Sequence, residues 1–233
     1  VDVMSLGLQA TASWLLGYPD QASRYLEEAL VAARDSNHAA TLGFLQSVSS
    51  ILLFLLGRDP EAARQQVEAL RLLSEKGLPL EAWAGSLSNW GPASNGRDET
   101  VLQRMRQGNE TFRAQGTGIG CGAQFLHLAR GYALAGQVNA GLDALKEALD
   151  WTNQTGIRLV EAEVHRLRGE LLLMDKPFEE DAVRAAEACF RTAIAIARRQ
   201  HARWWELRAT VSLCRLRVPH LLAPVVTDAD QVV

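Results

Sequence analysis

Apolar residues recur every three to four positions along most of the chain, and this period is typical of amphipathic α-helices. No segment alternates apolar and polar residues for long enough to predict a β-strand. We therefore expect an all-α fold of about 11 helices. The pattern places them at roughly 3–16, 20–35, 40–56, 60–75, 80–93, 98–114, 121–135, 138–154, 158–174, 179–199 and 203–217.

A template of about 40 residues repeats along the chain. Its copies begin at Gly17, Gly57, Gly96 and Gly136, which are 40, 39 and 40 residues apart. A small residue, a large residue and a second small residue follow each glycine in fixed places. A fifth copy lacks the glycine but keeps the other positions. The small residues expected at helix crossings are Ala22, Ala29, Ala62, Ala69, Ala148 and Ala193.

Each copy predicts a helical hairpin. Glycine adopts a positive φ without a steric penalty, so it suits the residue at which one helix ends and the chain turns. Pro19 and Pro60 then fall near the first turn of the next helix, where a missing N–H does no harm. The alanines allow the two helix backbones to approach closely, and we expect them to be buried.

The repeats predict one helical domain over residues 1–217, followed by a tail at 218–233. Its units are roughly 1–38, 39–78, 79–117, 118–156, 157–201 and a partial 202–217. A single hairpin cannot bury both of its faces, so neighbouring units are expected to stack into a solenoid. The last unit lacks a second helix. We expect residues 218–226 to lie across its exposed apolar face, and the adjacent Trp204 and Trp205 to be both buried only if that helix is covered on two sides.

The stretch "FLHLARGYALAGQVNAGLDALKEAL" resembles a tetratricopeptide repeat, through Phe125, Tyr132, Gly136 and the small residues that follow. Its period exceeds the usual unit of about 34 residues. A closer resemblance is to the long-period, tetratricopeptide-like C-terminal region of large bacterial regulators that carry a nucleotide cyclase and an AAA-type ATPase domain. The stretches "WLLGYPDQA", "EAEVHRLRGELLL", "EACFRTAIAIARRQ" and "WWELRATVSL" carry it.

The resemblance implies a right-handed α-solenoid whose concave groove is formed by the first helix of each hairpin. A ligand in the groove would contact residues of several repeats at once. The groove positions implied in this chain are Ser47, Ile51, Trp90, Arg130, Arg166, Glu170 and Glu206. Their mixed charge favours a peptide or protein ligand that carries both signs. At each single position, an ordinary solvated helix face is an equally good interpretation.

Composition excludes several other classes of protein. With 48% hydrophobic and 22% charged residues, the chain can bury a sizeable core, and its net charge of −3 disfavours nucleic-acid binding by the protein itself. The 3 cysteines form no CxxC pair, so we expect a reducing cytoplasm and neither a disulfide framework nor a zinc site. The apolar run "SVSSILLFLLG" is too short to span a bilayer, and the first residues do not resemble a signal peptide.

The sequence contains no recognisable reaction centre. The glycine-rich "GTGIGCGA" follows a helical segment, whereas a dinucleotide fingerprint follows a strand. The 5 histidines form no HExxH pair, and no serine lies in a nucleophile elbow. His165, which has Glu161 one turn earlier and Cys189 in the paired helix, is interpreted as core packing. We expect no enzymatic activity, cofactor or metal.

The sequence therefore favours a non-catalytic scaffold or adaptor that binds a protein or peptide on the concave face of the solenoid. The alternative is a regulatory or effector-sensing segment of a larger signalling ATPase, nucleotide cyclase or transcriptional regulator. A homodimer through the uncapped C-terminal end is a further possibility. The full-length open reading frame would distinguish an adaptor from a regulatory segment.

The third repeat is expected to be the weakest part of the domain. Gly108 and Asn109 stand where other copies have Ala-Leu, and glycine inside a helix costs about 1 kcal/mol relative to alanine. In a stack of repeats, one weak unit can decouple the two sides. Amide hydrogen exchange should be fastest around residues 92–120, and equal protection along all hairpins would contradict this.

Overall fold

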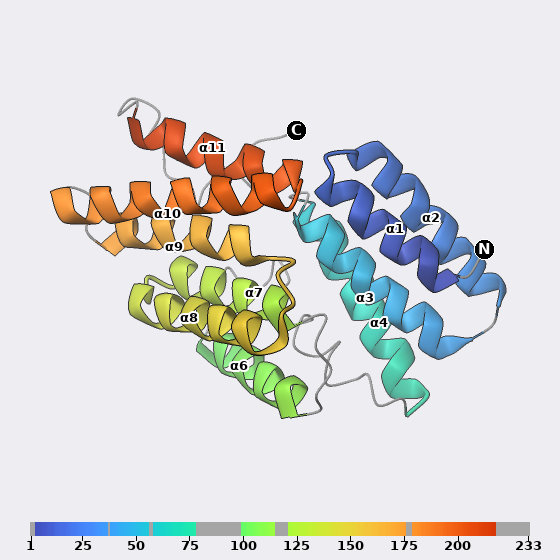
Figure 1. The fold of residues 1–233 in the computed structure, drawn as a ribbon. Coiled ribbons are helices and arrows are strands. Elements are labelled where there is room, and N and C mark those ends of the chain that lie inside the picture. Colours follow the sequence, from blue (N-terminus) through green and yellow to red (C-terminus); the bar gives the residue numbers. More distant parts are fainter. Residues whose placement is uncertain are drawn as a thin grey trace. The chain divides into compact units, whose positions relative to one another are not determined.

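The computed structural model describes residues 3–36, 38–55, 58–77, 99–114, 121–175 and 179–217. All regular secondary structure in these ranges is α-helical, which confirms the predicted fold class there (Figure 1). The helices are α1 (Val3–Leu15), α2 (Pro19–Asp35), α3 (Ala39–Leu55), α4 (Asp59–Glu75), α6 (Glu99–Ala114), α7 (Cys121–Leu134), α8 (Val138–Thr155), α9 (Glu161–Asp175), α10 (Glu180–Arg199) and α11 (Arg203–Arg217). The predicted helix at 80–93 and residues 218–226 lie outside the described residues.

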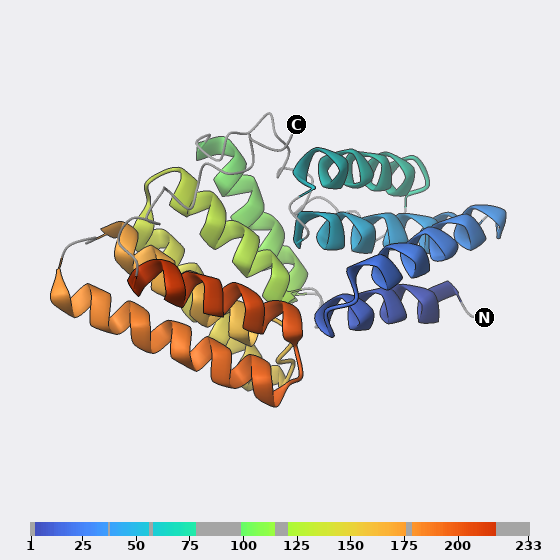
Figure 2. The same cartoon turned by 90° about the horizontal axis from the view of Figure 1, so that it is seen from above.

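Contacts between residues divide the chain into two compact units, 1–115 and 116–233. In the first unit, α1 packs against α2 and α3 packs against α4. In the second, α7 packs against α8, α9 against α10, and α10 against α11 (Figure 2). The pairs α1–α2, α3–α4, α7–α8 and α9–α10 correspond to predicted helical hairpins, so such hairpins are present in both units.

Alternate helices also contact one another within each unit. Helix α1 contacts α3 in the first unit, and α9 contacts both α7 and α11 in the second. These are the first helices of successive hairpins. Residues of successive hairpins, which are distant in sequence, therefore lie on neighbouring helices.

The turns at Gly17 and Gly136 have the predicted geometry. Gly17 and Gly136 have φ of 91° and 74°, in the left-handed region that favours glycine. In three hairpins a backbone N–H after the turn donates to the carbonyl five residues earlier, which satisfies the end of the first helix. These bonds join Tyr18 to Ser13 at 2.9 Å, Arg58 to Leu53 at 2.8 Å, and Gln137 to Tyr132 at 2.8 Å. Pro19 and Pro60 lie in the first turns of α2 and α4, as predicted.

The small residues of the template are buried, as predicted. This group comprises Ala22, Ala29, Ala62, Ala69, Ala148 and Ala193. Gly169 on α9 shows how close the helices come, because a Cβ added there would lie 2.6 Å from a ring carbon of Phe190 on α10. The core of each hairpin therefore depends on small side chains in one helix facing large ones in the other.

Helix α6 departs from this arrangement at the positions expected to be weak. Gly108 is half-buried, and Asn109 is only 4% exposed. The Nδ2 amide of Asn109 is buried and donates no hydrogen bond within the described part of the chain. A buried unsatisfied donor costs about 1–3 kcal/mol, which adds a second source of weakness to the glycine.

Helix α11 has one buried side and one exposed side. Trp205 is buried, whereas Trp204 is half-buried. Leu207 and Val211, one turn apart, are 56% and 39% exposed. Among the described residues, this outer side of α11 is therefore an apolar surface open to solvent.

The turn between α10 and α11 contains a backbone conformation that L-residues rarely adopt. His201 has φ of 54°, and Gly77 occupies the same place after α4 with φ of 62°. In each case the residue follows a helix cap, Gln200 or Lys76, that still has right-handed φ and ψ. A side chain in this left-handed position costs roughly 1–2 kcal/mol, whereas glycine carries no such penalty.

Replacing His201 by glycine should therefore stabilise the protein by up to about 1 kcal/mol, after the greater flexibility of glycine in the unfolded state is subtracted. Urea unfolding followed by circular dichroism would measure the change. Gln200→Gly is the matched control, and it should destabilise because Gln200 has φ of −87°. A His201→Gly variant no more stable than the wild type would show that the turn carries no strain.

Candidate functional site

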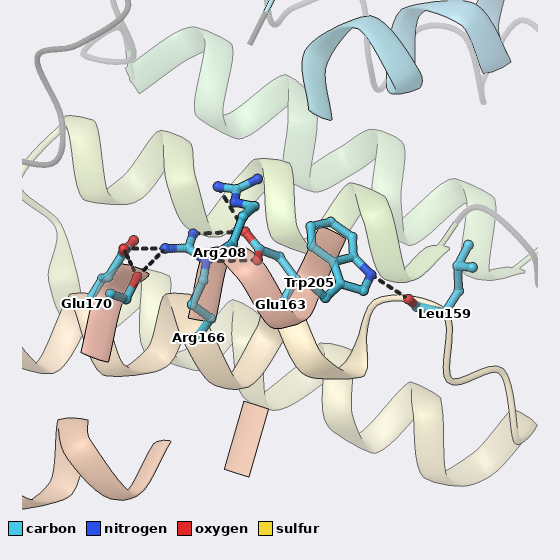
Figure 3. A network of polar contacts seen from close by, with 7 residues as sticks. Leu159, Glu163, Arg166, Glu170, Trp205 and Arg208 are labelled. Carbon is cyan, nitrogen blue, oxygen red and sulfur yellow. Dashed lines mark hydrogen bonds and ion pairs between the residues drawn. The ribbon is translucent and has the colours of Figure 1, made fainter. Parts of the chain in front are cut away.

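A network of charged and polar side chains joins α9 to α11 in the second unit (Figure 3). Its centre is the buried guanidinium of Arg166 on α9. Nε and Nη2 of Arg166 each donate to a carboxylate oxygen of Glu163 at 2.8 Å, so the pair is bidentate. Nη1 of Arg166 donates to Glu170 on the other side. One cation thus bridges two carboxylates.

The spacing of these residues explains why they meet. Glu163, Arg166 and Glu170 are three and four positions apart, and residues at such spacings lie on one face of a helix. Glu163 is buried, and the side chain of Glu170 is only 12% exposed. The charged face of α9 is therefore directed into the protein, which requires each charge to have a partner.

Helix α11 supplies the other half of the network. Arg208 places Nη2 3.2 Å from Oε1 of Glu163. One turn later, the Ser212 hydroxyl donates to Glu170 at 2.9 Å and accepts from Arg166 Nη1 at 3.2 Å. These contacts span more than 40 positions of sequence and fix the register of α11 against α9.

Trp205 completes this junction on the side towards the start of α9. Its indole Nε1 donates to the backbone carbonyl of Leu159 at 3.1 Å. The guanidinium carbon of Arg208 lies 5.8 Å from the centre of the Trp205 ring, within the range of a cation–π contact. The side chain of Arg208 is 30% exposed, so this cation is held in place by Glu163 and Trp205 while part of it faces solvent.

The network shifts the titration of its members. Burial would raise the pKa of Glu163, but the neighbouring Arg166 and Arg208 outweigh it and lower that pKa. Burial likewise opposes the charge of Arg166, yet Glu163 and Glu170 hold its pKa above the usual range. The pKa of Arg208 is lowered, first by burial, although the attraction of Glu163 opposes this. The ionised form of Glu163 is therefore the stable one.

Arg130 on α7 belongs to the same electrostatic neighbourhood. It is half-buried, and its charge helps to lower the pKa values of Glu163 and Arg208. Three successive first helices, α7, α9 and α11, thus contribute charged groups to one region.

Other residues of the predicted groove lie elsewhere. Glu206 accepts from Arg198 at 2.7 Å and from Arg203 at 3.3 Å, near the turn that joins α10 to α11. Ser47 and Ile51 belong to α3 in the first unit. The hydroxyl of Ser47 is buried and donates to the Gly43 carbonyl at 3.0 Å, and Ile51 is half-buried.

Of the seven predicted groove residues, the structure brings together Arg130, Arg166 and Glu170. Trp90 lies outside the described residues. Sequence reasoning missed Glu163, Arg208 and Ser212. The signal that could have found them is the acidic residue three positions before Arg166, together with two polar residues one turn apart on the following first helix.

A second titratable group lies on α7. His127 is buried, and burial together with the nearby Arg130 lowers its pKa to about 3. The ring is therefore neutral in the folded protein at ordinary pH.

His165 and Cys189 show no sign of activation for chemistry. Burial lowers the pKa of His165 and raises the pKa of Cys189, and both shifts favour the uncharged forms. Within the described ranges, no group of His, Cys, Asp or Glu is arranged to hold a metal ion. A helix with the length and apolarity needed to cross a membrane is likewise not found among the described residues.

Comparisons with protein-family models and with curated proteins found no match to this chain.

Removal of Arg166 should be far more damaging than removal of Arg208. Arg166→Met leaves Glu163 and Glu170 buried without the cation they share, which should cost about 3–5 kcal/mol in urea unfolding. Arg208→Met leaves the bidentate Glu163–Arg166 pair intact and should cost clearly less. Adding Glu163→Gln and Glu170→Gln to Arg166→Met should recover much of the loss, because no carboxylate is then stranded. Equal losses for the two arginine variants would contradict a network centred on Arg166.

Proposed function

We propose that this chain is a non-catalytic interaction scaffold. Its hairpins form a right-handed, tetratricopeptide-like solenoid that binds a protein or peptide on the face of the first helices, in the cytoplasm. One observation carries the proposal, namely that first helices contact one another within each unit. Such an arrangement presents equivalent positions of successive repeats side by side, which suits an extended ligand.

The chemistry of the second unit supports a ligand with acidic groups. Arg166 directs its donors to Glu163, Glu170 and Ser212, so its role is to hold the surface in shape. Arg208 is partly exposed and packs against Trp205. Arg130 is close enough for its charge to lower the pKa of Arg208. A carboxylate of the ligand can bind this partly exposed guanidinium while Trp205 fixes its orientation.

The exposed apolar side of α11 supports self-association as part of the same proposal. Leu207 and Val211 are solvent-exposed neighbours on the last described helix. Two copies that pair through this surface would each cover the other's apolar residues. In such a dimer, a ligand can still reach Arg208 only if Arg208 lies outside the surface through which the two copies pair.

A second candidate function is a regulatory or effector-sensing segment of a larger signalling ATPase, nucleotide cyclase or transcriptional regulator. A cavity inside the first unit favours it, because a scaffold that acts only through its surface has no need of an internal site. The two functions are compatible within one chain.

The scaffold proposal is tested on a partner captured with the full chain and then purified. The double variant Arg130→Ala/Arg208→Ala should weaken its binding at least about tenfold by calorimetry, since two charged contacts are lost. Arg184→Ala/Arg191→Ala is the matched control on the exposed surface of α10 and should bind like the wild type. Helical circular dichroism spectra like that of the wild type would show that both variants are folded. Full affinity in the first variant would place the contact elsewhere.

A further inference from the structure

The first unit contains a cavity of about 140 Å³ between its two hairpins. Much of its wall is apolar and comes from both hairpins. Trp14 on α1 and Leu26 and Leu30 on α2 line one part, and Leu52 and Leu53 on α3 line another. All five side chains are buried, so the cavity lies in the core between repeats.

Two polar side chains, Ser49 and Gln65, also line this wall. Ser49 on α3 is only 2% exposed. Gln65 on α4 also lines the cavity, and its Oε1 is buried without a donor in the described part of the chain. A buried polar group without a partner is costly. A ligand that offers a donor to Gln65 would remove that cost.

The size of the cavity limits the ligand. An apolar cavity of about 150 Å³ accommodates one benzene molecule, so this one has room for a single aromatic ring. Leucine side chains and an indole ring are suitable neighbours for such a ring. The unpaired Oε1 of Gln65 adds a requirement for a hydrogen-bond donor on the ring.

The mouth of the cavity limits the charge of the ligand. Arg58 and Glu61 line it and form an ion pair with each other, with Arg58 Nε donating to Glu61 Oε1 at 2.8 Å. Glu27 lies near the same arginine and adds a negative charge. The arginine is therefore already neutralised, and an anionic ligand would be repelled by the second carboxylate. A neutral ligand meets neither obstacle.

We propose that the cavity between the two hairpins of the first unit binds a small neutral single-ring aromatic compound that carries one O–H or N–H donor, such as phenol. The donor binds Oε1 of Gln65, the ring lies against Trp14 and the leucines, and the Ser49 hydroxyl contacts the polar substituent. This inference is independent of the scaffold function, because the proposed protein contact lies in the second unit.

The test compares phenol with toluene, which has the same shape but no donor, on the full chain by calorimetry and ligand-observed NMR. Phenol should bind saturably and more tightly than toluene. Gln65→Met keeps the shape of the side chain and should weaken phenol about three- to tenfold, the range of one neutral hydrogen bond, without weakening toluene. Gln107→Met, at an exposed position of α6, is the matched control and should change neither affinity.

Ser23→Leu should fill the cavity and abolish binding of both compounds, because Ser23 lines it from α2. If this variant melts well below the wild type, Leu30→Phe serves as the second filling variant. Absence of saturable phenol binding, or binding that survives both filling variants, would overturn the site. Equal affinities for phenol and toluene, unaffected by Gln65→Met, would overturn the chemical class of the ligand.

Discussion

Close approach of the two helices in each hairpin is the constraint on which the other features of this protein depend. Ala29, Ala69, Ala148 and Ala193 are completely buried at the crossings, and Gly169 lets the Phe190 ring reach the backbone of α9. A larger side chain at these positions would separate the helices and open the core. Because the two helices of each hairpin lie close together, the first helices of successive hairpins can also contact one another.

Because first helices contact one another, the residues between them are buried. In the second unit, several of these buried residues are charged. Arg166, Glu163 and Glu170 are stable there because each has partners on α9 or α11. Such a network contributes less to stability than an apolar core of equal size, but it tolerates only one register of the helices. This specificity keeps Arg208 in a fixed place beside Trp205.

Features decided within a few residues were predictable from the sequence, and features decided between helices were not. The turns at Gly17 and Gly136 follow from local backbone preference, and the buried alanines follow from the repeat. The pairing of Arg166 with Ser212 depends on the register of helices 46 positions apart, which no local pattern specifies. The cavity also depends on how helices pack against one another, because Ser49 and Gln65 line it from different helices, and the sequence therefore did not predict it.

The buried, neutral His127 couples the folding of the second unit to the proton concentration. In the unfolded chain the imidazole has its ordinary pKa of 6.5, whereas in the folded chain burial lowers the pKa to about 3. Between these values the unfolded chain binds one more proton than the folded one, so acid favours unfolding by about 1.4 kcal/mol per pH unit. Above pH 6.5 this histidine therefore does not lower the stability of the folded unit, and the stability decreases as the pH falls from 6.5 towards 3. One side chain thus makes this helical unit acid-labile well before its carboxylates titrate.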